Sequence, residues 1–389
     1  MAEKTVPVLV LVALVFADQA FVGTAPNGSL VLRPADGQQV LVDGVAFRSL
    51  LGRLDALERQ LAQQQCRVVA DTTSITSVEG RWVGAVLADN GKIFALPWNS
   101  QSFRVLVIDP IANAADTFAI NIAVSGTGLW DGAVLGKDGK IYGIPRNAEF
   151  VLVLDPVSNA TDITATTPGM SGADKWVGGV LAGNGKVYGM PFSSSSVLIF
   201  DPSTNMTDIT SIQGLVGIGK WHGGVLAGNG KIYGIPLDSE SVLVIDPDTN
   251  SASTIRSAPL RGGSKWIGGV IAHNGLIYGI PYESSSVLII DPTTNTTDTT
   301  TIAGLNSGMG AKWVNGVLGD DGNIYGIPYF SPSILIVNPS TGTADITTIT
   351  GLTALEKWAS GVSANGLIYA IPGSSKQPVL IIKRDCQRL

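Results

Sequence analysis

The 389-residue sequence contains only two histidines, two cysteines and 14% charged residues. So few histidines exclude a copper centre with several imidazole ligands and argue against a zinc site. Lysines and arginines form no run that could follow a phosphate backbone, and the net charge is −6, so we expect no nucleic-acid partner. The longest N-terminal apolar run, residues 6–17, is shorter than the roughly 20 residues that cross a bilayer. We therefore expect no stable membrane span.

The same N-terminal run has the features of an export signal. Lys4 precedes it, and Val15 and Ala17 are small enough for the two positions that a signal peptidase recognises. We interpret residues 1–17 as a signal peptide cleaved after Ala17, the alternative being an uncleaved anchor. This predicts a secreted or cell-surface protein. Four Asn-x-Ser/Thr sequons are predicted glycosylation sites of a eukaryotic secretory pathway, although three share one turn position and turn chemistry alone would also explain them: Asn27, Asn159, Asn205 and Asn295.

A repeat built around tryptophan fills most of the chain. The tryptophans that begin the copies are 45 to 48 residues apart: Trp82, Trp130, Trp176, Trp221, Trp266, Trp313 and Trp358. This period is typical of a β-propeller. We predict an all-β protein in which a seven-bladed propeller of four-stranded blades occupies residues 66–389, with each tryptophan packed between blades.

Each copy carries the turn signals of one blade. An Asn-Gly or Asp-Gly pair such as Asn274-Gly275 predicts a two-residue type I′ hairpin between the first two strands. Pro281 ends the second strand because proline lacks the backbone donor. Residues 287–290 form an apolar third strand that we expect to be buried on both faces, and Asp291-Pro292 begins the next turn.

The seventh copy lacks a fourth strand, and the missing strand lies at the other end of the chain. Residues 70–75 match residues 297–302, so we expect the N-terminal segment to complete the last blade and close the ring. Aligned on the fifth copy, Cys66 and Cys386 fall in one turn. Export to an oxidising compartment favours a disulfide there, and we predict a Cys66–Cys386 bond.

Residues 18–65 are predicted to form a stalk before the propeller. Phe47, Leu50, Leu54, Leu57 and Leu61 recur at spacings of three and four, which predicts an amphipathic, coiled-coil-like helix. Residues 30–42 are expected to add a small β layer. The stalk would join copies through residues 46–65 into a homo-oligomer and multiply the binding sites; alternatively, the helix docks on its own propeller.

The string Asn-Gly-Lys-Ile-Tyr, a serine-rich loop, and then Val-Leu-Ile-Ile-Asp-Pro-x-Thr-Asn resembles the YVTN-type β-propeller repeats of surface-layer proteins and of quinoprotein-like propellers. The resemblance covers residues 66–389. It implies a propeller fold but transfers no activity, because such repeats support binding and catalysis alike.

The residue after each strand-ending proline is large and apolar or aromatic in five of seven copies, and polar residues follow it. Such a ring is suited to stacking on a sugar and bonding its hydroxyls; the alternative is that these residues cap the blades. The candidate ligand-binding residues are Trp98, Arg146, Phe192, Tyr282 and Tyr329; Leu237 and Gly373 occupy the same position in the other two copies.

Six cations stand directly before the tryptophans and are candidate channel-mouth cations: Arg81, Lys175, Lys220, Lys265, Lys312 and Lys357. They would surround the channel mouth and attract an anion, or each would pair with a local acid such as Asp174. Asp131 and His222 replace the aliphatic residue that otherwise follows the tryptophan, and His273 lies beside a hairpin turn. Two histidines without a third ligand in register predict no metal site.

No constellation of catalytic residues is visible in the sequence. We therefore expect a secreted, non-enzymatic binding or scaffold propeller without a cofactor, which recognises a glycan or an extracellular protein through its loop-rich face. The alternatives are a hydrolase of the propeller lactonase type, with a metal and an acidic pocket formed by Glu149, Glu240 and Glu283, and a structural protein of a cell coat or matrix.

Overall fold

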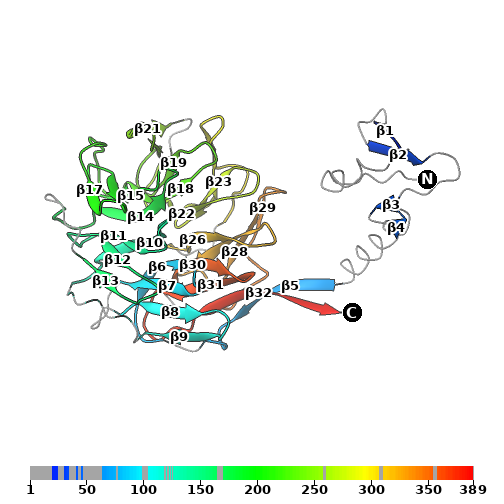
Figure 1. Ribbon diagram of the computed structural model, residues 1–389, viewed down its shortest axis with the longest axis horizontal. Coiled ribbons are helices and arrows are strands. Elements are labelled where there is room, and N and C mark those ends of the chain that lie inside the picture. The colour runs from blue at the N-terminus through cyan, green and yellow to red at the C-terminus, as the bar shows by residue number, and fades with distance from the viewer. Residues whose placement is uncertain are drawn as a thin grey trace. The chain divides into compact units, whose positions relative to one another are not determined.

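The computed structural model describes residues 20–24, 30–34, 41–42, 45–46, 64–75, 78–98, 104–117, 120, 122, 124, 126–163, 170–256, 260–305, 310–353 and 357–388 (Figure 1). The chain divides into two compact units. One comprises Met1–Arg67 with Asp385–Leu389, and the other comprises Val68–Arg384. The second unit contains nearly all of the propeller.

Seven four-stranded antiparallel sheets form the blades, as the repeat predicted. The first strand of every blade begins at the repeated tryptophan. These strands are β6 (Trp82–Leu87), β10 (Trp130–Leu135), β14 (Trp176–Leu181), β18 (Trp221–Leu226), β22 (Trp266–Ile271), β26 (Trp313–Leu318) and β30 (Trp358–Ala364). Each contacts the first strand of the next blade, and β30 contacts β6. The first strands therefore surround the axis in a closed ring.

The second and third strands supply the buried middle of each blade. The second strands, all ending at proline, are β7 (Ile93–Pro97), β11 (Ile141–Pro145), β15 (Val187–Pro191), β19 (Ile232–Pro236), β23 (Ile277–Pro281), β27 (Ile324–Pro328) and β31 (Leu367–Pro372). The third strands are β8 (Leu106–Asp109), β12 (Leu152–Leu154), β16 (Leu198–Asp201), β20 (Val242–Asp246), β24 (Leu288–Asp291), β28 (Leu335–Asn338) and β32 (Leu380–Arg388).

The fourth strands are short except in the last blade. They are β9 (Ala114–Asp116), β13 (Thr161–Asp162), β17 (Met206–Asp208), β21 (Ser251–Ile255), β25 (Thr296–Asp298), β29 (Thr343–Asp345) and β5 (Gln64–Asp71). The order in the seventh blade is β30-β31-β32-β5. The N-terminal strand therefore completes the last blade, which confirms the prediction from the sequence match.

Each repeated tryptophan is buried and ties two parts of its own blade together. The indole nitrogen of Trp266 donates to the carbonyl of Ser286 at 2.7 Å, and that of Trp313 donates to Ser333 at 2.7 Å. The acceptor precedes the third strand, so the bond fixes the loop that returns from the second strand. A buried indole N–H needs such a partner.

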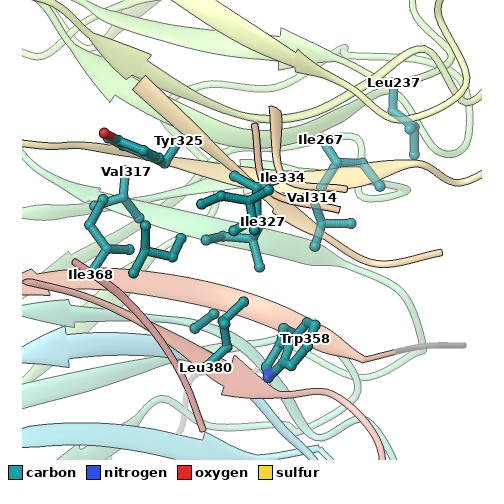
Figure 2. Packing of buried hydrophobic residues seen from close by; sticks show 13 residues of the cluster. Leu237, Ile267, Val314, Val317, Tyr325, Ile327, Ile334, Trp358, Ile368 and Leu380 are labelled. Carbon is teal, nitrogen blue, oxygen red and sulfur yellow. The ribbon is translucent and has the colours of Figure 1, made fainter. Parts of the chain in front are cut away.

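The core consists of apolar layers between neighbouring blades. In one cluster Val317 and Ile327 of blade 6 pack with Ile368 and Leu380 of blade 7, and Trp358 lies in the same layer (Figure 2). Further clusters of buried aliphatic residues repeat around the ring. The apolar runs of the sequence are explained by this burial on both faces of each blade.

The hairpins between first and second strands differ from the predicted type I′ turns in six of the seven blades. In blade 1 the amide of Gly91 donates to the carbonyl of Ala88, and Ala88 pairs with Lys92. Only the glycine of each pair has a positive φ, 77° at Gly91, so the loop has three residues with a type I turn and a glycine bulge. In blade 7 both Asn365 and Gly366 have positive φ. That copy is one residue shorter and forms the predicted turn.

The turns between third and fourth strands explain the repeated asparagines. Asn159, Asn205 and Asn295 are exposed and have φ of 53° to 59°, a conformation that asparagine tolerates better than most residues. Asn113 and Asn250 occupy the same position without a sequon. Turn geometry thus accounts for the asparagines, and their glycosylation stays a prediction.

The unit that contains the N-terminal residues has two small described sheets. β1 (Ala20–Thr24) pairs with β2 (Leu30–Pro34), and β3 (Leu41–Val42) pairs with β4 (Val45–Ala46). β2 and β3 fall within residues 30–42, where a β layer was predicted, but each pairs with a strand outside that stretch. The signal peptide, Asn27 and the predicted stalk helix lie outside the described residues. Among those described, no helix is long and apolar enough to cross a membrane.

The predicted disulfide lies outside the described side chains as well. Cys66 belongs to β5 and Cys386 to β32, two strands that are neighbours in the seventh blade. The positions of the two sulfur atoms are not described. The Cys66–Cys386 bond stays a prediction.

Candidate functional site

A cavity of about 520 Å³ opens around the propeller axis. Every residue that follows a strand-ending proline contributes to its wall. We call these the post-proline residues: Trp98, Arg146, Phe192, Leu237, Tyr282, Tyr329 and Gly373. The structure therefore brings together all five candidate ligand-binding residues named from the sequence.

Backbone hydrogen bonds hold the post-proline residues in a ring. The amide of Phe192 donates to the carbonyl of Lys175 in its own blade, and the carbonyl of Phe192 accepts from the amide of Lys220 in the next blade. The same two bonds recur at Tyr282, with Lys265 and Lys312. Because both backbone groups are used, the positions of these side chains are fixed by the fold while their identity is free to vary.

Arg146 forms the most polar part of the wall. Its Nε donates to Oδ1 of Asp174 at 2.6 Å, and its NH1 donates to Oδ2 of Asp131 at 3.1 Å. The guanidinium lies 4.6 Å from the ring centre of Trp98 and 5.3 Å from that of Phe192. Two carboxylates and two aromatic rings thus hold the arginine in one position.

His222 lies in the wall beside this group. Its ring meets that of Phe192 edge to face, with centroids 6.2 Å apart. Its Nδ1 is shielded from solvent and has no hydrogen-bond partner among the described residues. Burial lowers the pKa of the imidazole, and the Arg146 guanidinium reinforces this effect, while the Asp131 carboxylate and the backbone of His222 itself oppose it. The net effect favours the neutral form of the ring.

Tyrosines contributed by blades 5 and 6 lie at another part of the wall. The rings of Tyr282 and Tyr329 are tilted with centroids 6.2 Å apart, and Tyr329 stacks on Phe330 at 4.9 Å. In blade 7 the post-proline residue is Gly373, whose carbonyl accepts from Nε of Arg81 at 2.8 Å. The wall is therefore aromatic at blades 5 and 6, whereas the post-proline residue of blade 7 adds no side chain to it.

A ring of glycines lines the cavity along the first strands. Gly132 and Gly178 have φ of 99° and 76°, and a Cβ added to Gly178 would lie 2.7 Å from the Cα of Gly223. Blade 6 has Asn315 at this position, and its Nδ2 donates to the carbonyl of Ala359 at 3.0 Å. Close approach of the backbones explains why the sequence repeats glycine here.

The five lysines predicted at the channel mouth are buried between blades, so that interpretation is wrong for them. We call them the inter-blade lysines: Lys175, Lys220, Lys265, Lys312 and Lys357, each at most 6% exposed. Nζ of Lys220 donates to the carbonyls of Phe192, Ser194 and Gly217, and it lies 5.8 Å from the ring centre of Trp221. Of the six cations only Arg81 lines the cavity.

Carbonyl oxygens, rather than the local acids considered from the sequence, receive the described hydrogen bonds of these lysines. Lys265 Nζ donates to Leu237 and Gly262, and Lys312 Nζ donates to Tyr282. Burial lowers the pKa of Lys220 to about 8. The lysines thus join the loop entering one blade to the post-proline residue of the blade before it.

The described residues contain no group of three or more histidine, cysteine or acidic side chains placed to hold a metal ion. Glu149, Glu240 and Glu283 do not line the central cavity, and Glu240 lies 3.4 Å from Arg256. The acidic pocket that a lactonase-type site would need is therefore not formed by these three residues. Asp131 is the acidic residue in the described lining.

No protein-family model matches the sequence, and no curated protein matches it. Solved propellers are similar in fold. A catalytically inactive virginiamycin B lyase from Staphylococcus aureus, solved with quinupristin, is 10% identical, covers 82% of this chain and 99% of its own, and has a TM-score of 0.61. The WD40 repeats of RRP9 are 12% identical, with coverages of 83% and 100% and a TM-score of 0.59.

An extracellular domain of a putative one-component system from B. thetaiotaomicron is also similar. It is 9% identical, the match covers 80% of this chain and 42% of that one, and the TM-score is 0.57. At such identities the likeness concerns the fold alone. The chain is a seven-bladed β-propeller, and its resemblance to YVTN-type repeats stays a hypothesis from the sequence.

Proposed function

We propose that this protein is an extracellular, non-enzymatic binding propeller that accommodates one or two sugar units of a glycan in its central cavity. The observation that carries the proposal is the gathering of four aromatic post-proline residues, Trp98, Phe192, Tyr282 and Tyr329, around one cavity that also contains Asp131, Arg146 and His222. Aromatic rings stack on the apolar face of a sugar, and convergent polar groups bond its hydroxyls.

The dimensions of the cavity support a small ligand. About 520 Å³ lies within the range of roughly 300–1,000 Å³ that is typical of small-molecule sites. A protein partner would instead need about 800 Å² of surface on this side of the interface, which the cavity alone does not supply. A glycan terminus is the class that fits both the volume and the mixed aromatic and polar wall.

The extracellular setting is supported by two independent features. The N-terminal apolar run has the features of an export signal, and the structurally similar propellers include the extracellular domain of a putative one-component system. Assembly through residues 46–65, if the predicted stalk forms, would present several cavities together and raise the avidity for a multivalent glycan.

A glycan array probed with the purified full chain tests the proposal. We expect binding to a defined set of glycans, and a loss of about tenfold or more for Trp98→Ala and for Tyr282→Ala, since stacking on an aromatic ring is lost. Ile111→Ala, at an 86% exposed turn residue away from the cavity lining, is the matched control. Binding that survives both cavity substitutions, or no binding to any glycan, would overturn the proposal.

A further inference from the structure

We propose that His222 contacts the ligand through its Nε2 atom and selects a neutral, hydroxyl-bearing sugar ring over an acidic one. This inference rests on the proposed function and specifies its ligand class. It begins from the position of the histidine in the repeat. The residue after the tryptophan is Val83, Val177 or Val314 in three other blades, so the fold accepts an aliphatic side chain there.

The imidazole of His222 has a buried nitrogen without a hydrogen-bond partner among the described residues, whereas an aliphatic side chain at this position would have no polar atom. Nδ1 of His222 is shielded and unpartnered among the described residues. A buried polar atom without a hydrogen bond is unfavourable to folding. The side chain nevertheless lines the cavity and is partly exposed, which leaves Nε2 as the ring nitrogen available to a ligand.

The same geometry keeps the ring uncharged. An imidazolium donates from both nitrogens, and Nδ1 of His222 has no acceptor among the described residues. Burial also lowers the pKa of the ring. A neutral imidazole has one donor and one acceptor nitrogen and therefore suits a hydroxyl group, which can take either role. It offers a carboxylate no positive charge.

The positive charge of the neighbouring Arg146 is already engaged by protein carboxylates. Arg146 already donates to Asp131 and Asp174, and the aromatic rings of Trp98 and Phe192 lie on it. The carboxylate of an acidic ligand at this wall would compete with Asp131 and Asp174 for the Arg146 guanidinium. It would also be repelled by the negative charge of Asp131. A neutral ring can stack on the exposed part of the aromatic wall without disturbing the group.

The chain offers a direct measurement because it has only two histidines. In protein labelled with ¹⁵N-histidine, the imidazole of His222 can be followed beside that of His273, which lies on an exposed hairpin and serves as an internal reference. The probes are methyl galactoside, methyl glucoside and methyl mannoside, each compared with glucuronate. We expect a neutral sugar to shift the His222 nitrogens saturably and glucuronate to leave them unchanged.

Affinity of the best neutral probe is then measured for His222→Val, which restores the side chain found in blades 1, 3 and 6. We expect about tenfold weaker binding with an unchanged or higher Tm, because the unpartnered nitrogen is removed. Ile111→Ala, at the exposed turn residue outside the cavity lining, should change the affinity less than threefold.

The outcomes separate the two proposals. Unchanged affinity in His222→Val, with binding lost in Trp98→Ala and Tyr282→Ala, would overturn the role of His222 and leave the glycan site standing. If glucuronate binds more tightly than the neutral sugars, and Arg81→Gln abolishes that binding, the preference for a neutral ligand is wrong while the glycan site stands. If no sugar binds or shifts either histidine, both proposals are wrong.

Discussion

The carboxylate of Asp131, the second residue of β10, lies 3.1 Å from the guanidinium of Arg146, the residue directly after β11. Both residues depart from the repeat within the same blade: the other copies place an aliphatic residue or His222 at the first position and an aromatic residue, Leu237 or Gly373 at the second. Two departures from the repeat, one in β10 and one directly after β11, thus make this position of the ring polar, whereas it is mainly apolar in the other blades.

This pairing predicts that replacing Arg146 alone destabilises the protein more than replacing Arg146 and Asp131 together. Arg146→Met leaves the Asp131 carboxylate, 9% exposed, without its partner, and we expect the free energy of unfolding to fall by about 2–4 kcal/mol. The double variant Asp131→Val with Arg146→Met restores the apolar pattern of the repeat and should recover most of that loss. Urea unfolding measures both; a double variant as unstable as the single one would contradict the pairing.

The inter-blade lysines predict an unusual dependence on pH. Burial lowers the pKa of Lys220 from 10.5 to about 8, so between these values the unfolded chain binds more protons than the folded one. The free energy of unfolding should therefore rise with pH from this source. Tm of the wild type and of Lys220→Met is compared from pH 7.5 to 9.5, below the titration of unfolded tyrosines near pH 10. We expect Tm of the wild type to increase relative to Tm of the variant as the pH rises. A constant difference would show that Lys220 has an ordinary pKa.

The glycine ring predicts that one methyl group suffices to disturb the axis. In Gly178→Ala the new Cβ would lie 2.7 Å from the Cα of Gly223, and the residue has φ of 76°. We expect a loss of about 2 kcal/mol or more in the free energy of unfolding. Gly228→Ala is the matched control, since nothing lies within 4 Å of its added Cβ. Equal stabilities of the two variants would exclude the close approach.

The register of the blades sharpens the disulfide prediction. In blade 5 Ile289 lies opposite Asp298, and in blade 7 the aligned residues are Ile381 and Asp71. Five residues on from Ile381 is Cys386, and five back from Asp71 is Cys66. Lys383 Nζ bonds Oδ2 of Asp71 at 3.0 Å, in agreement with this antiparallel pairing.

Directly opposed residues of antiparallel strands are close enough for a disulfide. Peptide mapping without reductant should therefore recover one linked Cys66–Cys386 peptide. Closing a loop of this length would stabilise the fold by about 5–6 kcal/mol in the chain-entropy model, so reduction should lower Tm. Recovery of both thiols in free form would refute the bond.

Periodic features of this protein could be predicted from the sequence because they depend on local chemistry repeated seven times. The tryptophan spacing, the strand-ending prolines and the match between residues 70–75 and 297–302 determined the blade number, the strand order and the closure of the ring. The position of the post-proline residues also followed, since their location depends only on where the second strand ends.

Only the tertiary structure decided where the repeated cations point. Each of Lys220, Lys265 and Lys312 donates to the carbonyl of the post-proline residue in the preceding blade, a contact about 30 residues away in the sequence that no local pattern indicates. The six three-residue hairpins were likewise settled by backbone pairing. The sequence did mark Asp131, Arg146 and His222 as departures from the template, but that they share one wall depends on how successive blades meet at the axis.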